Sequence, residues 1–253
     1  MNNFPSEMKA VILAAGVGSR IRPMTDNCPK CLLKIGENTI LEMMISHIQD
    51  CGIKEVVFVI GYLQDHIINY VKTAFPDLTV HFVINEKYQE TNTGYSLMLT
   101  KDYIQDATFI KFDADVVFDK AILKKLIEFE TENSLCIDTQ IHLDAEEVKV
   151  IVDSNNRIIK VGKSVHPQEA AGESIGIEKI GGQTAALLFA ELKTMMDDDN
   201  NHQEYYEAAY ERLIDKGIPF HALDITDIGW TEIDTAEDFA TAESIFVSES
   251  VYG

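Results

Sequence analysis

The 253-residue sequence is poor in basic residues: 21 Lys and Arg stand against 42 Asp and Glu, a formal net charge of −21 at pH 7. A chain with so large a negative excess does not attract nucleic acid or an anionic membrane surface through its overall charge. It also lacks an apolar run long enough to span a bilayer, and the polar stretch before Met8 does not have the pattern of a secretory signal. The sequence therefore predicts a cytoplasmic protein that neither binds nucleic acid nor inserts into membranes.

Cysteine is scarce as well, with only Cys28, Cys31, Cys51 and Cys136. Cys28 and Cys31 have the spacing of a redox pair. A zinc site needs two further soft ligands nearby, and the sequence has no second Cys-x-x-Cys motif and no His pair. We therefore expect reduced, structural thiols, with a redox pair as the alternative.

Internal repeats and low-complexity segments are absent, and so is a hexapeptide array that would build an appended left-handed β-helix. Hydrophobic residues make up 46% of the chain, which is enough to form the core of one large domain. The sequence therefore predicts a single domain over residues 1–253.

Segments with the apolar period of strands alternate with segments that have the period of helices. Strands are expected at residues 9–13, 55–60, 79–84, 108–112, 134–141, 148–152, 158–161 and 220–224. Helices are expected at residues 41–51, 64–74, 94–101, 119–131, 186–196, 203–216 and 235–245. Thr39 with Glu42, and Thr235, are expected to cap two of the helices. The pattern predicts an α/β fold, a Rossmann-like layered sheet that is parallel in its first half and has an antiparallel addition in its second.

The most informative stretch follows the first strand and runs from residue 13 to residue 30. Its small residues allow the backbone to approach a ligand closely, and successive N–H groups can form an anion site. Arg20 and Lys30 add positive charge to an otherwise acidic chain. Two familiar phosphate motifs do not fit, because Ile21 replaces the third glycine of the dinucleotide fingerprint and no Gly-Lys-Ser/Thr triplet is present. The stretch predicts a site for a small polyanion such as a nucleoside triphosphate; a glycine-rich turn with a solvated basic face is the alternative.

The order of these residues resembles the signature of the nucleotidyltransferase superfamily, which includes sugar-1-phosphate nucleotidyltransferases and phosphocholine cytidylyltransferases. The matching pieces are Leu13 to Arg20 (Leu-Ala-Ala-Gly-x-Gly-x-Arg), Pro23-Met24-Thr25 and Pro29-Lys30. The resemblance implies that the nucleotide is bound by Leu13, Ala14, Ala15, Gly16, Val17, Gly18 and Ser19. It implies that Arg20 holds the β- and γ-phosphates and that Lys30 contacts the α-phosphate, both as catalytic residues. It also implies a nucleotide-binding half at about residues 9–130 and an acceptor-binding half at about 131–245.

Acidic residues at two distant positions are expected to complete the site. Asp113 and Asp115 follow the strand at 108–112, and carboxylates at the C-terminal edge of a parallel strand point into the crevice where ligands bind. In the family an aspartate at this place binds Mg²⁺, and Asp115 aligns best with it, with Asp113 in reserve and an acidic helix start as the alternative. Asp234 lies in a stretch that resembles the family's Glu-Ile-Asp-Thr. The resemblance makes it the second Mg²⁺ ligand, which is compatible with a place at a helix N-terminus.

Three further segments resemble the phosphocholine and phosphonate cytidylyltransferase branch more than the sugar enzymes. They are the Asn-containing loop at 91–97, Gly-Glu-x-x-Gly-Ile at 172–177 and Tyr-Tyr-Glu at 205–207. The resemblance assigns Asn92 and Ser96 to the nucleotide, and Glu173, Tyr206 and Glu207 to the acceptor.

The aromatic residues near these motifs have two interpretations. Tyr205, Tyr206 and Trp230 could form an acceptor-binding wall for a quaternary ammonium group. The alternative, which we favour for Tyr206 and Tyr210, is that helical spacing makes these two tyrosines part of a buried stripe. Lys163 resembles the catalytic lysine that contacts the acceptor phosphate, with an ordinary surface lysine as the alternative.

These features predict a Mg²⁺-dependent nucleotidyltransferase in which the phosphate of a small phosphorylated or phosphonylated acceptor attacks the α-phosphorus of a nucleoside triphosphate and pyrophosphate leaves. That phosphate is ionised at neutral pH, since its second pKa is ~6, so no catalytic base is required. CTP and phosphocholine are favoured by the resemblance alone. The alternatives are a sugar-1-phosphate nucleotidyltransferase that uses UTP, dTTP or GTP, a nucleotide-binding regulator without catalysis, and an NAD or redox enzyme. The sequence does not fix the oligomeric state, and a homodimer stays open.

Overall fold

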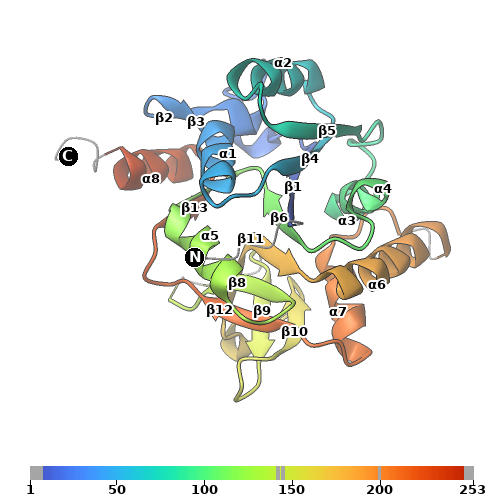
Figure 1. The fold of residues 1–253 in the computed structure, drawn as a ribbon. Helices are drawn as coiled ribbons and strands as arrows, with labels where there is room; N and C mark the ends of the chain where they lie inside the picture. Colours follow the sequence, from blue (N-terminus) through green and yellow to red (C-terminus); the bar gives the residue numbers. More distant parts are fainter. Residues whose placement is uncertain (1–7, 141–142, 144–145, 199–200, 248–253) are drawn as a thin grey trace.

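The computed structural model describes residues 8–140, 143, 146–198 and 201–247 (Figure 1). The strands are β1 Lys9–Ala14, β2 Lys34–Ile35, β3 Asn38–Thr39, β4 Glu55–Ile60, β5 Thr79–Ile84, β6 Phe109–Asp113, β7 Val116–Phe118, β8 Ser134–Asp138, β9 Lys149–Val152, β10 Ile158–Gly162, β11 Gly172–Ile180, β12 His221–Asp224 and β13 Trp230–Glu232. The helices are α1 Ile40–Asp50, α2 Gln64–Ala74, α3 Thr93–Met98, α4 Lys101–Ile104, α5 Lys120–Glu128, α6 Gly182–Lys193, α7 Glu207–Asp215 and α8 Ala236–Phe246. The predicted α/β class is confirmed.

The parallel half of the main sheet has the order β5-β4-β1-β6, with β1 paired in parallel to both β4 and β6. Successive side chains of each strand point to opposite faces of the sheet, and both faces are buried. Ala10 and Ile12 pack into one hydrophobic cluster with α1, α2 and α5, whereas Val11 and Leu13 pack into a second cluster with α3, α6 and α7. This two-sided burial explains the nearly continuous apolar runs of these strands.

Strand β11 joins the parallel half to the rest of the sheet, and the sequence prediction missed it. All nine of its residues are buried, and it pairs antiparallel with β6, β8 and β9. Its register shifts between Ser174 and Glu178, where Gly176 has a φ of 76°. A side chain at position 176 would lie 2.6 Å from Asp113 Oδ2, so this bulge requires glycine. The segment that was interpreted only as an acceptor motif is therefore also a central strand.

The predicted antiparallel addition is confirmed, since β8 and β9 pair antiparallel with β11 and β10 pairs antiparallel with β9. The strand expected at 220–224 is β12, which pairs with β8 in parallel. Residue 141, at the end of the expected strand 134–141, lies outside the described residues. The helix expected at 203–216 begins only at Glu207, because the backbone of the preceding segment bonds elsewhere: Asn92 N and Gly94 N donate to the carbonyls of His202 and Glu204. The helix expected at 94–101 is split into α3 and α4.

Two predicted caps are confirmed. Thr39 and Glu42 form a reciprocal capping box at the start of α1, and Thr235 caps α8 with Asp238. Helix α8 packs against β13, which pairs with β7 (Figure 1). The capped start of α8 thereby fixes the segment that carries Asp234 beside the end of β6. Within the described residues, no helix has both the length and the apolar character needed to cross a membrane.

Candidate active site

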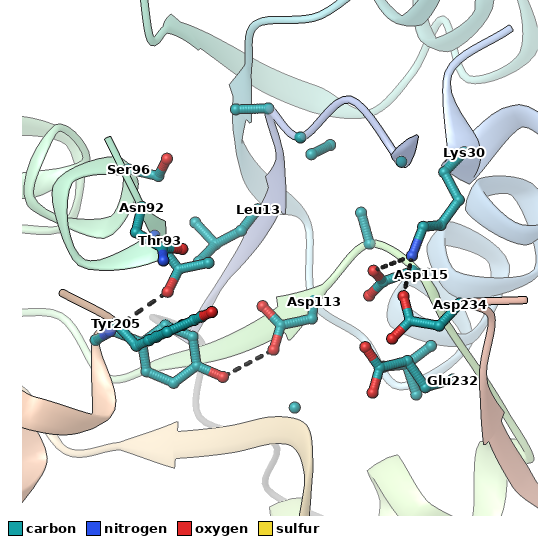
Figure 2. A pocket seen from close by; sticks show the side chains of 18 of the residues that line it. Leu13, Lys30, Asn92, Thr93, Ser96, Asp113, Asp115, Tyr205, Glu232 and Asp234 are labelled. Atoms are coloured by element: carbon teal, nitrogen blue, oxygen red, sulfur yellow. Dashed lines mark hydrogen bonds and ion pairs between the residues drawn. The ribbon is translucent and has the colours of Figure 1, made fainter. Parts of the chain in front are cut away.

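A cavity of about 550 Å³ opens at the C-terminal ends of β1 and β6. Its walls come from the loop after β1, the start of α3, strand β11 and the segment that leads into α7. In Figure 2, Asp115, Glu232 and Asp234 gather with Lys30 at one end, and Asn92 and Ser96 lie at the other side. Ligands of open α/β sheets bind at this position, outside the carboxyl ends of the parallel strands.

The loop after β1 presents small residues to the cavity. Of the seven residues expected to bind a nucleotide here, six line it: Leu13, Ala14, Ala15, Gly16, Gly18 and Ser19. Val17 is not among the lining residues. Gly18 has a φ of 62°, and its carbonyl accepts a hydrogen bond from Thr25 Oγ1 at 2.8 Å. The loop is thus fixed in a conformation that glycine adopts easily, with room for a ligand along its backbone.

Lys30 contacts two acids that lie far away in the sequence. Its Nζ atom is 2.8 Å from Asp115 Oδ2 and 2.7 Å from Asp234 Oδ1. Burial alone lowers the pKa of Lys30, but the two carboxylates outweigh that effect and hold the pKa above its ordinary value. Arg20 adds a second cation, with Nη2 2.6 Å from Asp234 Oδ2. The structure therefore brings the expected basic and acidic residues together at one end of the cavity.

Glu232 joins Asp115 and Asp234 in a cluster of three carboxylates. One oxygen from each residue lies within 4.8 Å of the others. Mg²⁺ binds proteins through one or two such carboxylates and takes phosphate oxygens or water as its other ligands. Partial desolvation beside its neighbours, together with repulsion by Asp115 and Asp234, raises the pKa of Glu232, although its side chain lies at an exposed position. The donor set and its excess negative charge fit a divalent metal ion.

Asp113, the reserve metal ligand, belongs to a different cluster. Lys111 is fully buried and places its Nζ 2.8 Å from both Asp113 Oδ2 and Glu178 Oε2. Tyr206 donates a hydrogen bond to Asp113 Oδ2 at 2.7 Å and accepts one from Lys111. Burial raises the pKa of Glu178, and Lys111 opposes this effect. Asp113 is therefore held by Lys111 and Tyr206, whereas Asp115 faces Lys30.

The acceptor residues expected from the sequence line the remaining end of the cavity. Lys163 follows β10, and its Nζ lies 4.9 Å from the ring centroid of Tyr205. Glu173 on β11 and Glu207 at the start of α7 both line the cavity and are only 6% exposed. Burial raises the pKa of Glu207 to about 7, with Lys111 opposing it. Among the residues that the structure describes, this end of the cavity is acidic and contains one lysine.

Asn92 and Ser96 line the cavity at the N-terminus of α3. Asn92 Oδ1 accepts a hydrogen bond from Thr93 N at 2.8 Å, and Asn92 Nδ2 donates to the carbonyl of Gln203. Ser96 Oγ accepts a hydrogen bond from Asn85 Nδ2 at 3.1 Å. Asn92 therefore connects α3 to the segment before α7.

Comparison with known proteins agrees with this geometry. The family model described as "Nucleotidyl transferase" matches residues 9–160, which is more than half of the chain. The chain belongs to the nucleotidyl transferase family. The matched region carries the first loop, Lys30 and Asp115, whereas Asp234 and Glu207 lie beyond it.

Full-length relatives resemble this nucleotidyl transferase along nearly the whole chain. The CTP:phosphoglutamine cytidylyltransferase of Campylobacter jejuni is 30% identical over 250 residues, covering 91% of this chain and 97% of the relative. The choline-phosphate cytidylyltransferase of Streptococcus pneumoniae is 29% identical over 252 residues, covering 96% and 100%. A solved structure of a CTP:phosphocholine cytidylyltransferase from Streptococcus pneumoniae superimposes with a TM-score of 0.78 at 23% identity, covering 94% of this chain and 99% of that one. The family and the predicted fold are thereby confirmed.

Trp230 does not lie where an aromatic wall requires it. It is not among the residues that line the cavity; its Nε1 donates to Asp138 Oδ2 at 2.8 Å and its ring packs against the first core cluster. Pairing of β13 with β7 fixes this position. Tyr206 and Tyr210 are both buried, in agreement with the stripe that we favoured.

Several cavity residues were not assigned a role from the sequence, among them Asn85, Tyr88, Glu146, Glu147 and Glu232. A signal for Glu232 was present, since Glu232 and Asp234 are two positions apart at the end of a short strand, where alternate side chains point the same way. Asn85 comes directly after the parallel strand β5, much as Asp113 is the last residue of the parallel strand β6.

The four cysteines are not joined by disulfides in the structure and are free thiols. Cys31 lines the cavity but is only 3% exposed, and burial raises its pKa to about 12. A thiol with so high a pKa is a poor nucleophile and a poor metal ligand at neutral pH.

Proposed function

We propose that this nucleotidyl transferase is a Mg²⁺-dependent cytidylyltransferase, which joins the CMP unit of CTP to a small phosphorylated or phosphonylated amine and releases pyrophosphate. The observation that carries the proposal is the contact of Lys30 with both Asp115 and Asp234 beside the first loop. CTP is favoured because the full-length relatives of similar size are cytidylyltransferases.

The reaction is a single displacement. An oxygen of the acceptor phosphate or phosphonate attacks the α-phosphorus of CTP, the bond from that phosphorus to the bridging oxygen breaks, and pyrophosphate leaves with the bonding electrons. The attacking oxygen is already ionised at neutral pH, so no side chain has to remove a proton. Catalysis then consists of positioning two anions and neutralising their charge.

Each of these tasks has a candidate in the cavity. The amides of Ala15 to Ser19 and the guanidinium of Arg20 hold the β- and γ-phosphates, and Lys30 contacts the α-phosphate. Lys163 holds the acceptor phosphate. Asp115, Asp234 and Glu232 hold the metal ion, which supplies Lewis-acid charge neutralisation when it is bound. Asn92 and Ser96 belong to the nucleotide wall.

The test is pyrophosphate release from CTP, UTP, GTP, ATP and dTTP, each paired with phosphocholine, phosphoethanolamine, 2-aminoethylphosphonate, glucose 1-phosphate and inositol 1-phosphate. We expect release with CTP and an amine-bearing acceptor. Release with glucose 1-phosphate and UTP or dTTP would show a sugar-1-phosphate nucleotidyltransferase instead. Binding of nucleotide by the folded protein without release from any pair would show a nucleotide-binding regulator and refute the proposal.

A further inference from the structure

Building on the proposed cytidylyl transfer, we propose that the acceptor carries an ammonium group with N–H bonds, which donates to Glu207, and that this site selects against quaternary ammonium groups. Three independent features of the cavity support this specificity. They are its negative charge, a buried carboxylate oxygen without a hydrogen-bond partner among the described residues, and the lysines that already lie over two of its aromatic rings.

The end of the cavity that Lys163, Glu173 and Glu207 line is negatively charged, which favours an acceptor molecule that carries a positive charge. Glu146, Glu147, Glu173 and Glu207 line this part of the cavity, and Lys163 is the one cation that lines it among the described residues. An acceptor phosphate brings further negative charge into this surface. A neutral polyol phosphate brings no positive charge to these carboxylates, whereas a zwitterionic acceptor places its own positive charge among them.

Glu207 supplies a specific hydrogen-bond acceptor. Its side chain is 6% exposed and lines the cavity, and among the described residues its Oε2 atom has no hydrogen-bond partner. A buried carboxylate oxygen is stabilised most by a charged N–H donor. A primary ammonium group provides three such donors, and a trimethylammonium group provides none.

The aromatic rings of the cavity do not form a free cage. Tyr206 is 2% exposed, with Lys111 Nζ 3.7 Å from its ring centroid. The ring of Tyr205 already has Lys163 Nζ at 4.9 Å. The third lining aromatic residue, Tyr88, packs against Gly61 on the nucleotide side, beside Asn85. Quaternary ammonium groups are usually bound by several converging aromatic faces, and here two of the three rings already have a lysine of this chain over them.

The experiment uses one series of acceptors that differ by single methyl groups: phosphoethanolamine, its N-methyl and N,N-dimethyl derivatives, and phosphocholine. Ethyl phosphate is added as the acceptor without a cation. We expect kcat/KM for pyrophosphate release with CTP to fall along the series, by about 10-fold or more between the first and last members, as for loss of charge-assisted hydrogen bonds. Equal or faster turnover of phosphocholine by the wild-type enzyme would overturn the inference.

Glu207→Gln tests the residue itself. We expect KM for phosphoethanolamine to rise about 10-fold, KM for CTP to change less than about two-fold, and the preference for primary over quaternary acceptors to shrink. Glu211→Gln, one turn further along α7 and outside the cavity lining, is the matched control and should keep the preference. A folded Glu207→Gln variant with an unchanged preference would refute the assignment; if the variant does not fold, the methyl series on the wild type still decides the question.

Failure of the inference and failure of the proposed function give different results. Transfer to phosphocholine or to a sugar phosphate in preference to phosphoethanolamine refutes the specificity and leaves nucleotidyl transfer intact. Absence of pyrophosphate release with every nucleotide and acceptor refutes the proposed function, and the inference with it.

Discussion

The Nζ atom of Lys30 lies 2.7 Å from Oδ1 of Asp234, although 204 positions separate the two residues. The same ammonium group is 2.8 Å from Asp115, which lies on the loop after β6. Two carboxylates that would repel one another are thus held together by a single cation. These three side chains form one electrostatic unit, and a change in any of them alters the other two.

Replacement of Lys30 by Ala is expected to lower kcat by at least about 10²-fold, the scale seen when one electrostatic stabiliser of a transition state is removed. The measurement is pyrophosphate release at saturating substrates, with the melting temperature as a check on folding. Lys34→Ala is the matched control, since Lys34 is exposed and lies outside the cavity lining. Normal release from folded Lys30→Ala enzyme would contradict the assigned role.

Asp234→Ala is expected to lower kcat by at least about 10²-fold as well, and the cause should be separable from that of Lys30→Ala by titration with Mg²⁺. Because Asp234 is one of three clustered oxygen donors, its loss should raise the Mg²⁺ concentration that gives half-maximal activity. Glu232→Gln should raise that concentration too, with a smaller effect on kcat. An unchanged Mg²⁺ titration curve in both variants would exclude the cluster as the metal site.

Lys111→Met is expected to destabilise the protein by about 3–5 kcal/mol, because it leaves the fully buried Glu178 without its cation. The double variant Lys111→Met with Glu178→Met should recover part of that loss, since the fully buried pair is then removed and only Asp113 still lacks its cation. Urea denaturation of the wild type and both variants measures the free energies of unfolding. A double variant no more stable than the single one would show that the ion pair itself is not the cause.

The pKa of Glu207, raised to about 7 by burial, predicts a pH dependence of stability. Between its ordinary value of 4.5 and about 7, the folded protein keeps a proton that the unfolded chain has lost. The contribution of Glu207 is therefore fully present below about pH 4.5 and is lost as the pH rises toward 7, by up to about 3 kcal/mol. Glu207→Gln should lose less stability than the wild type between pH 5 and 7 in urea denaturation. A difference between the two proteins that does not change with pH would refute this cause.

Local patterns in the sequence were enough to predict the local structure and the parts of the site that depend on neighbouring residues. The helix caps at Thr39 and Thr235 follow from side chains that accept bonds from the first free N–H groups of a helix. The strand before Ala15 and the small residues of the loop follow from hydrophobic patterning and from the space that a ligand needs along the backbone. Carboxylates directly after parallel strands were expected at the cavity edge, where Asp115 lies.

Which distant groups meet became visible only in the folded chain. Strand β11 was not predicted because Glu178 and Lys179 interrupt its apolar pattern, yet both residues are buried. Lys111 forms an ion pair with Glu178. Lys179 donates hydrogen bonds to the carbonyls of Leu126 and Phe129. Trp230 was expected in the acceptor wall, but pairing of its strand with β7 places its indole beside Asp138 instead. The physical reason is that strand pairing and the neutralisation of buried charge depend on partners far away in the chain, which no local period encodes.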